Sequence, residues 1–174
     1  PDGKIYGSVT NPVNLGTGGG RSDSPSTAGG GAAMVTVAGN LVVNGVISAN
    51  GIWWGDTSSS GGSVNIRAGT LAGSGTIRAN AGTGSYTGAG GGRVAVKLTA
   101  GDFTGFTGSI TAYGGNQGIA SGAAGTVYKQ TAAQADGQGT LVIDNGNRTA
   151  WLGVVTLMPM GLDLNAFEQI VITN

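Results

Sequence analysis

The sequence predicts an all-β fold, specifically a parallel β-helix (a solenoid) of about five coils. The segment LVVNGVISAN at 41–50 returns as LAGSGTIRAN at 71–80, with five identical residues at positions thirty apart. Glycine-rich loops of twelve residues recur at 51–62, 81–92 and 114–125, and the segments between them alternate apolar and polar residues. Alternation indicates strands with one buried face, and a repeat of this length is typical of stacked coils.

Each repeat carries apolar stripes that a single coil cannot bury. The first strands supply the pairs Val35 and Val37, Val64 and Ile66, and Val94 and Val96. The second strands centre on one aliphatic anchor each, namely Ile47, Ile77, Ile110, Leu141 and, in a fifth repeat, Ile170. Stacking the coils buries every stripe against its equivalent in the next coil. A β-sandwich or jelly roll has the same strand content and is the alternative, but it does not require columns of identical residues.

We expect one domain over residues 1–174. Residues 1–33 are expected to hold a strand at Lys4 to Thr10 and a glycine-rich lid over the first coil. Four repeats fill 34–146, and a last coil over 147–174 is expected to be covered by a tryptophan at its end. The chain lacks an initial methionine and ends in a strand-like run. From this we expect a module excised from a larger multidomain protein, with neighbouring domains covalently linked to it.

Outward-facing residues of a solenoid form columns, because equivalent positions of successive coils stack about 4.8 Å apart. Three columns are predicted: Ser48, Arg78, Thr111 and Val142; Ala38, Arg67, Lys97 and Gln130; and Asn50, Asn80, Tyr113 and Asp144. We expect the third column to be a ladder of side-chain amides that caps a turn.

The composition excludes several classes of protein. The chain has 37 glycines, only 9% charged residues and a formal net charge of zero, and it has neither cysteine nor histidine. Nucleic-acid binding requires clusters of lysine and arginine, and the sequence contains no such cluster. No apolar run approaches the roughly 20 residues that a membrane-spanning helix needs. Low charge with abundant glycine, serine, threonine and asparagine is typical of an extracellular or cell-surface protein.

Three segments carry a resemblance to known proteins: GGSVNIRAGTLAGSGTIRANAG, GGGRVAVKL and GAAGTVYK. Together they resemble the glycine-rich repeats of large secreted bacterial surface and polysaccharide-associated proteins, over roughly residues 29–146. The resemblance implies a right-handed parallel β-helix. Related folds serve as carbohydrate-binding modules, adhesin stalks and polysaccharide lyases, so the resemblance leaves these three functions open.

The loops are expected to place aromatic and polar side chains at one edge of the solenoid, at adjacent heights. An aromatic ring can stack on the apolar face of a sugar, while carboxylate, amide and guanidinium groups bind its hydroxyls. The expected glycan-binding residues are Trp53, Trp54, Asp56, Arg78, Tyr86, Tyr113, Asn116 and Gln117. We therefore predict a non-catalytic module that binds a plant or microbial polysaccharide such as xylan. A stalk or adhesin segment is the first alternative.

Catalysis has little support in the sequence. Glycosidases need paired carboxylates, whereas this chain has one glutamate, Glu168, and aspartates scattered over different coils. A lyase with Arg67 and Lys97 as basic residues is the second alternative, although both are expected to be solvated cations on an exposed strand face. No catalytic residue and no cofactor are predicted. Asp144 and Asn147 offer oxygen ligands suited to Ca²⁺, but a turn is the preferred interpretation of this segment.

Overall fold

The computed structural model describes residues 7–21, 24–84, 88–116, 121–150, 153–159 and 161–173, and the regular secondary structure of these residues is almost entirely β-strand. Its one helical element is a 3-10 turn, η1 (Leu164–Ala166). Residues 7–10, at the end of the expected first strand, form bends and not a strand. Trp151, the tryptophan expected to cover the last coil, lies outside the described residues, as do residues 4–6.

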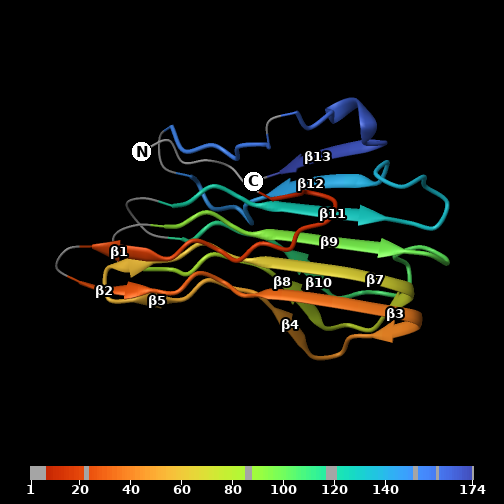
Figure 1. Ribbon diagram of the computed structural model, residues 1–174, viewed down its shortest axis with the longest axis horizontal. Coiled ribbons are helices and arrows are strands. Elements are labelled where there is room, and N and C mark those ends of the chain that lie inside the picture. The colour runs from red at the N-terminus through yellow and green to blue at the C-terminus, as the bar shows by residue number, and fades with distance from the viewer. Residues whose placement is uncertain are drawn as a thin grey trace.

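The structure confirms a parallel β-solenoid, of about four turns. A six-stranded sheet has the order β13-β12-β11-β9-β7-β3, and a three-stranded sheet has the order β10-β8-β4 (Figure 1). The long-sheet strands are β3 (Ala32–Val42), β7 (Ser63–Ala72), β9 (Arg93–Leu98), β11 (Thr126–Gln130), β12 (Thr140–Asp144) and β13 (Gln169–Thr173). The second sheet consists of β4 (Val46–Ser48), β8 (Thr76–Arg78) and β10 (Ser109–Thr111).

The stacked apolar columns form the core between the two sheets. Val64, Val94 and Val127 are register partners in the long sheet, and Ile77 pairs with Ile47 and Ile110 in the second sheet. Val64, Val94 and Ile77 are fully buried. Burial of this kind contributes about 25 cal/mol per Å² of apolar surface. The regular spacing of the repeat stabilises the stack because it places apolar side chains of successive coils against one another.

The predicted columns are correct in the middle of the stack and wrong at its ends. Ser48, Arg78 and Thr111 are register partners, as are Arg67, Lys97 and Gln130. In the first coil, however, Thr36 and not Ala38 lies opposite Arg67, because β3 and β7 pair in an unbroken register from Ala32 opposite Ser63 to Val37 opposite Ala68. The predicted column members that the structure moves elsewhere are Ala38, Val142 and Asp144.

The asparagine ladder exists, but its bonds join side chains to backbone. Asn50 Oδ1 accepts a hydrogen bond from the Asn80 N–H at 2.8 Å, and Asn80 Oδ1 accepts one from the Tyr113 N–H at 2.8 Å. The next member is Asn145, not Asp144, because Asn145 Oδ1 accepts from the Gly114 N–H at 2.9 Å. Asn50 and Asn80 thereby each satisfy a backbone donor of the following coil, whereas Asn145 satisfies one of the coil before it.

The assignment of Leu141 and Ile170 to the second sheet is wrong. The segment after β11 turns back, and β12 pairs antiparallel with β11, so that Leu141 lies opposite Tyr128 in the long sheet. β13 then pairs parallel with β12, with Ile170 opposite Leu141. Residues 147–174 therefore add a strand to the long sheet where a further coil was expected. Tyr128 and Leu141 form a second core on the outer face of this sheet, together with Val9 and Phe167.

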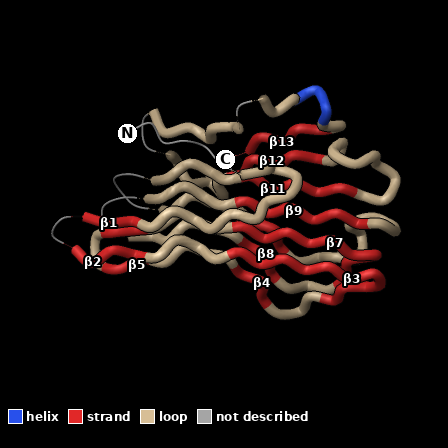
Figure 2. The backbone as a smooth tube through the Cα atoms, in the orientation of Figure 1, coloured by secondary structure: helices blue, strands red, loops and turns tan. Residues whose placement is uncertain are grey.

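The glycine-rich loops are hairpins that stack on one another at one edge of the solenoid (Figure 2). Within hairpins, the Ser59 N–H donates to Ile52 O and the Gly122 N–H to Gly115 O, at 3.1 and 2.9 Å. Between hairpins, the Gly82 N–H donates to Ser59 O at 2.9 Å. A further hairpin, with β1 (Gly19–Arg21) and β2 (Ser24–Thr27), joins this stack. It packs against the next hairpin and leaves the edge of the first coil exposed, so it is not the lid that we expected.

Two adjacent small residues form the neck where a hairpin returns to the long sheet: Gly61–Gly62, Gly91–Gly92 and Ala124–Gly125. The Gly62 N–H donates to Ala49 O at 2.8 Å, and the Gly92 N–H to Ala79 O at 2.7 Å. A side chain on Gly61 would overlap the neck of the next coil at Ala79 O, and one on Gly62 would overlap the preceding chain at Gly31 O. The coils can therefore stack only because neither residue has a Cβ.

The neck predicts that alanine substitutions at two equivalent glycines, Gly62 and Gly31, change the stability by very different amounts. Gly62→Ala forces a Cβ into the backbone of the preceding coil, whereas a Cβ on Gly31 meets nothing within 4 Å, since no coil among the described residues lies on that side. We expect Gly62→Ala to lower the free energy of unfolding by at least about 2 kcal/mol and Gly31→Ala to change it by less than about 0.5 kcal/mol. Urea unfolding of both variants measures this. Equal destabilisation by the two substitutions would contradict the role given to the neck.

Candidate functional site

Two adjacent tryptophans project from a short hairpin. Trp53 pairs with Ser58 and Trp54 with Thr57, which joins β5 (Trp53–Trp54) to β6 (Thr57–Ser58). Gly55 has a φ of 52° and makes the tight turn possible. Thr57 and Ser58 are buried, while Trp53 and Trp54 are 58% and 65% exposed. Successive residues of a strand point to opposite sides, so the rings project from opposite faces of the hairpin.

Asp56 occupies the turn of the same hairpin and is half-buried. The hairpin tip therefore combines two exposed aromatic rings with one carboxylate. Ser59 holds the base of this hairpin: its Oγ donates to Ala28 O at 2.6 Å and accepts from the Ile52 N–H at 2.9 Å. This base fixes the direction in which the tip projects.

Arg78 lies apart from this hairpin. It is the last residue of β8, and its Nε donates to Ser48 Oγ on the neighbouring strand at 3.3 Å. Asn116 is exposed in the third hairpin, and its Oδ1 accepts from Ser121 Oγ at 3.4 Å. Tyr86 and Gln117, the two other expected binding residues in the hairpins, lie outside the described residues.

Tyr113 is held beneath the turn that follows β12. The Arg148 guanidinium lies 5.0 Å from the centre of its ring, and Arg148 Nη1 donates to Gly114 O at 2.6 Å. Burial and the nearby Asp144 carboxylate raise the pKa of the Tyr113 hydroxyl. Its ring therefore packs against the chain itself, and Tyr113 is part of the cap on the third coil.

Arg67 and Lys97 stack as expected, but Lys97 is not a solvated cation. Lys97 is only 5% exposed, and its Nζ forms an ion pair with Asp136 at 2.9 Å. The ammonium also lies 5.9 Å from the centre of the Tyr128 ring. Asp136 belongs to the turn between β11 and β12 that covers this face of the sheet. Neither cation lines either of the two cavities described for this protein.

Asp144 and Asn147 form a turn. Asp144 Oδ1 accepts from the Gly146 N–H at 2.8 Å, and Asn147 has a φ of 60°, a conformation that asparagine tolerates in turns. Within the described ranges, no group of three or more acidic, histidine or cysteine side chains is placed to hold a metal ion. Likewise, no described helix is long and apolar enough to cross a membrane.

A groove at the bases of the hairpins was not predicted from the sequence. The residues that start three successive long-sheet strands, Ser63, Arg93 and Thr126, are register partners there, and the latter two line the groove. The sequence feature that could have indicated this groove is the polar residue that directly follows Gly62, Gly92 and Gly125. Its walls, however, come from the N- and C-terminal segments, whose positions the repeat does not specify.

In comparisons with known proteins, no family model, no curated protein and no solved structure matches this chain. The resemblance to glycine-rich surface repeats therefore stays an expectation. Support for a function comes from the chemistry of the exposed side chains.

The ion pair of Lys97 and Asp136 predicts a pH-dependent contribution to stability. Lys97 holds the pKa of Asp136 below its ordinary value of 3.8, so the contribution is present above that pH and is lost as the pH falls through the lowered pKa. We expect Asp136→Asn to lower the free energy of unfolding by about 1 kcal/mol at neutral pH and this difference to shrink below about pH 4.

Urea unfolding as a function of pH measures the difference. The matched control is the same substitution in a Lys97→Met background, where Asp136→Asn should have little effect because its partner is gone. A difference between wild type and Asp136→Asn that stays constant with pH would show that the ion pair does not stabilise the fold.

Proposed function

We propose that this protein is a non-catalytic module that binds a polysaccharide outside the cell or at its surface. The observation that carries the proposal is the pair of exposed tryptophans, Trp53 and Trp54, on one strand of a hairpin whose other strand, β6, is buried. Large exposed aromatic rings are unfavourable in water unless they serve an interaction. Two rings held on a rigid support can stack on sugar rings with little loss of conformational entropy.

The stack of hairpins supports a polymeric ligand over a small one. The Trp53–Trp54 hairpin is tied to its neighbours on both sides, by the Gly82 N–H to Ser59 O bond and by the Ser60 N–H to Thr17 O bond at 3.1 Å. Rings at the edge of such a stack are accessible from outside and are not enclosed in a pocket. An open edge suits a long chain that continues beyond the protein on both sides.

A structural segment of a longer surface protein is the second candidate, and the exposed β3 edge favours it. Met34, Val42 and Val46 in the first coil are 67%, 54% and 60% exposed. The sequence from residue 24 to residue 55 contains no charged residue, although charged residues commonly protect free sheet edges. Such an edge is what one coil presents to another within a stack. This candidate predicts no affinity for glycans.

The tryptophans give the direct test of glycan binding. We expect the double variant Trp53→Ala, Trp54→Ala to weaken binding at least about tenfold, because aromatic anchors carry most of the energy at such sites. Affinity electrophoresis and calorimetry against xylans, glucans, mannans and uronic-acid polymers measure the loss.

Met34→Ala is the matched control, since it removes an exposed apolar side chain from β3, outside the hairpin, and should leave binding unchanged. If wild type binds none of these polymers, or if the double variant binds as well as wild type, the proposed function is wrong. Binding lost equally in Met34→Ala would point to nonspecific apolar adhesion.

A further inference from the structure

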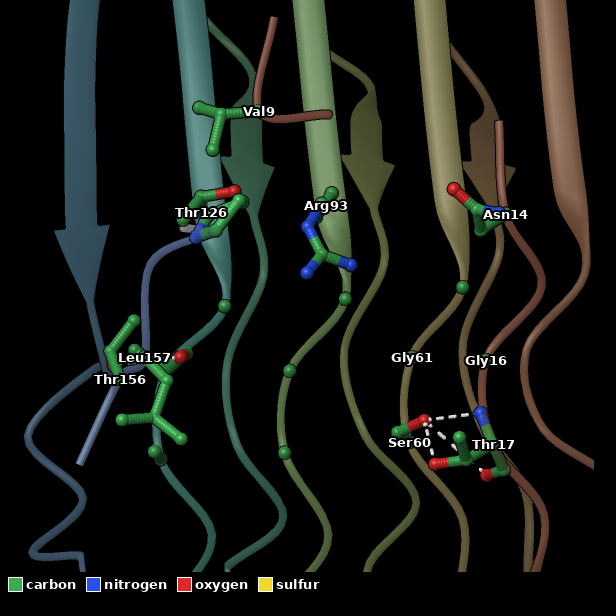
Figure 3. A pocket seen from close by; sticks show the side chains of 18 of the residues that line it. Val9, Asn14, Gly16, Thr17, Ser60, Gly61, Arg93, Thr126, Thr156 and Leu157 are labelled. Carbon is green, nitrogen blue, oxygen red and sulfur yellow. Dashed lines mark hydrogen bonds between the residues drawn. The ribbon is translucent and has the colours of Figure 1, made fainter. Parts of the chain in front are cut away.

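A groove of about 450 Å³ crosses the bases of the hairpins (Figure 3). Its floor is the backbone of small residues at 61–62, 90–92 and 123–125, from three successive coils. Residues 14–17 bound one end, and residues from 155–159 bound the other. Figure 3 shows Asn14 and Thr17 on one side and Thr156 and Leu157 on the opposite side. The volume lies within the range of about 300 to 1,000 Å³ that is usual for ligand sites.

The chain itself fills both ends of the groove, and these contacts show what the floor binds. At one end, Ser63 Oγ donates to Asn14 O at 2.6 Å, and Ser60 Oγ accepts from the Thr17 N–H at 2.6 Å. The hydroxyls of Thr17 and Ser60 are also bonded, at 2.9 Å. At the other end, Thr156 Oγ1 donates to a floor carbonyl at 2.8 Å. The serines beside the floor thus bond to a carbonyl, an N–H and a hydroxyl, and the floor carbonyl bonds to a hydroxyl; hydroxyls are groups that a sugar also provides.

Thr126 repeats the position of Ser63 but lacks its partner. Ser63, Arg93 and Thr126 are register partners at the starts of β7, β9 and β11. Ser63 Oγ donates to Asn14 O of the N-terminal segment. The Thr126 side chain lines the groove and is 4% exposed, and its Oγ1 has no hydrogen-bond partner among the described residues. Buried hydroxyls are almost always bonded, so this one indicates that a partner is missing.

Arg93 lies between Ser63 and Thr126 and is the one charged side chain among the groove's lining residues. Its guanidinium has five N–H donors in a planar fork. This fork matches the two oxygens of a carboxylate. No acidic side chain lines the groove, so a negatively charged ligand meets no like charge from the lining.

We propose that this groove binds a glycan segment that carries a uronate, with its carboxylate at Arg93 and a sugar hydroxyl or ring oxygen at Thr126. Less than 1 Å² of Thr126 Oγ1 is exposed, so the ligand reaches it by a rotation of that side chain. That the ligand is a glycan rests on the proposed function. That it carries an acidic group rests on the groove alone. The tip with Trp53 and Trp54 is a separate contact, since neither tryptophan lines the groove.

The test uses a galacturonate trimer and the same trimer with its carboxylates methyl-esterified. Calorimetry on wild type should show binding of the acid that is at least about tenfold tighter than that of the ester. Thr126→Val keeps the shape and removes the hydroxyl, and Arg93→Gln removes the charge. We expect each to weaken binding of the acid about tenfold, with Arg93→Gln also removing the preference over the ester.

Matched controls carry the same changes elsewhere: Thr111→Val in the second sheet and Arg67→Gln on the exposed outer face should bind as wild type does. A second variant, Gly90→Leu, keeps the inference testable if Arg93→Gln fails to fold. A Cβ on Gly90 meets only Ala123 O, at 4.0 Å, so the leucine fits the backbone and occupies the groove. It should abolish binding of the trimer while the thermal unfolding of the protein stays close to that of wild type.

The outcomes separate this inference from the proposed function. If wild type does not bind the acidic trimer, binds the ester equally well, or binds the trimer unchanged after Thr126→Val and Gly90→Leu, the groove is not a uronate site. Binding of polymer lost only in the Trp53→Ala, Trp54→Ala variant would then leave the proposed function intact. Conversely, trimer binding that persists in that double variant and is lost in Gly90→Leu supports the groove without the tryptophans.

Discussion

The stack depends on a close approach of backbone to backbone at the neck of each hairpin. The Gly125 N–H donates to Ala112 O at 2.7 Å, repeating the bond of Gly92 to Ala79 in the coil before. In the pairs Gly61–Gly62 and Gly91–Gly92, the first glycine faces the following coil and the second faces the preceding one, and a Cβ on either would overlap the neighbouring backbone. Strand pairing, the apolar columns and the hairpin stack all require the coil spacing that this contact permits. The glycine content, which in another arrangement would favour disorder, is therefore a condition of the fold.

The neck also determines at which positions the coils can carry different solvent-facing side chains. The two sheets bury their inner faces against each other, and much of the outer face of the long sheet is covered by the turn with Asp136 and by the segment with Phe167. Hairpin tips and hairpin bases are left as surfaces that can change without disturbing a column. Trp53 and Trp54 occupy a tip, whereas Arg93 and Thr126 lie at the bases. Both places are supported by a ladder of hydrogen bonds, so their side chains are held in fixed relation to one another.

The repeat made the solenoid, the two sheets and the edge position of the hairpins predictable, because each follows from period and alternation. The direction of β12 was not predictable, since alternating residues such as those around Leu141 fit parallel and antiparallel pairing equally well. The burial of Lys97 depends on Asp136, a residue of a turn with no equivalent in the repeat. Of the candidate site, the exposure of the tryptophans followed from their place in a loop. The groove did not follow, because its walls are segments outside the repeat.

Departures from the repeat are of two kinds, and the structure distinguishes them. Some end the stack: Lys129 stands opposite Val96 in an inward column with its ammonium 5.4 Å from the Phe103 ring, and Ala124 replaces a neck glycine where no further neck follows. Asn145 likewise completes the asparagine ladder from a segment that turns back. Other departures leave the stacking intact, as Trp54 and Arg93 do. Residues of the second kind are not needed to end the stack. The tryptophans and the groove are therefore the places where a function is expected.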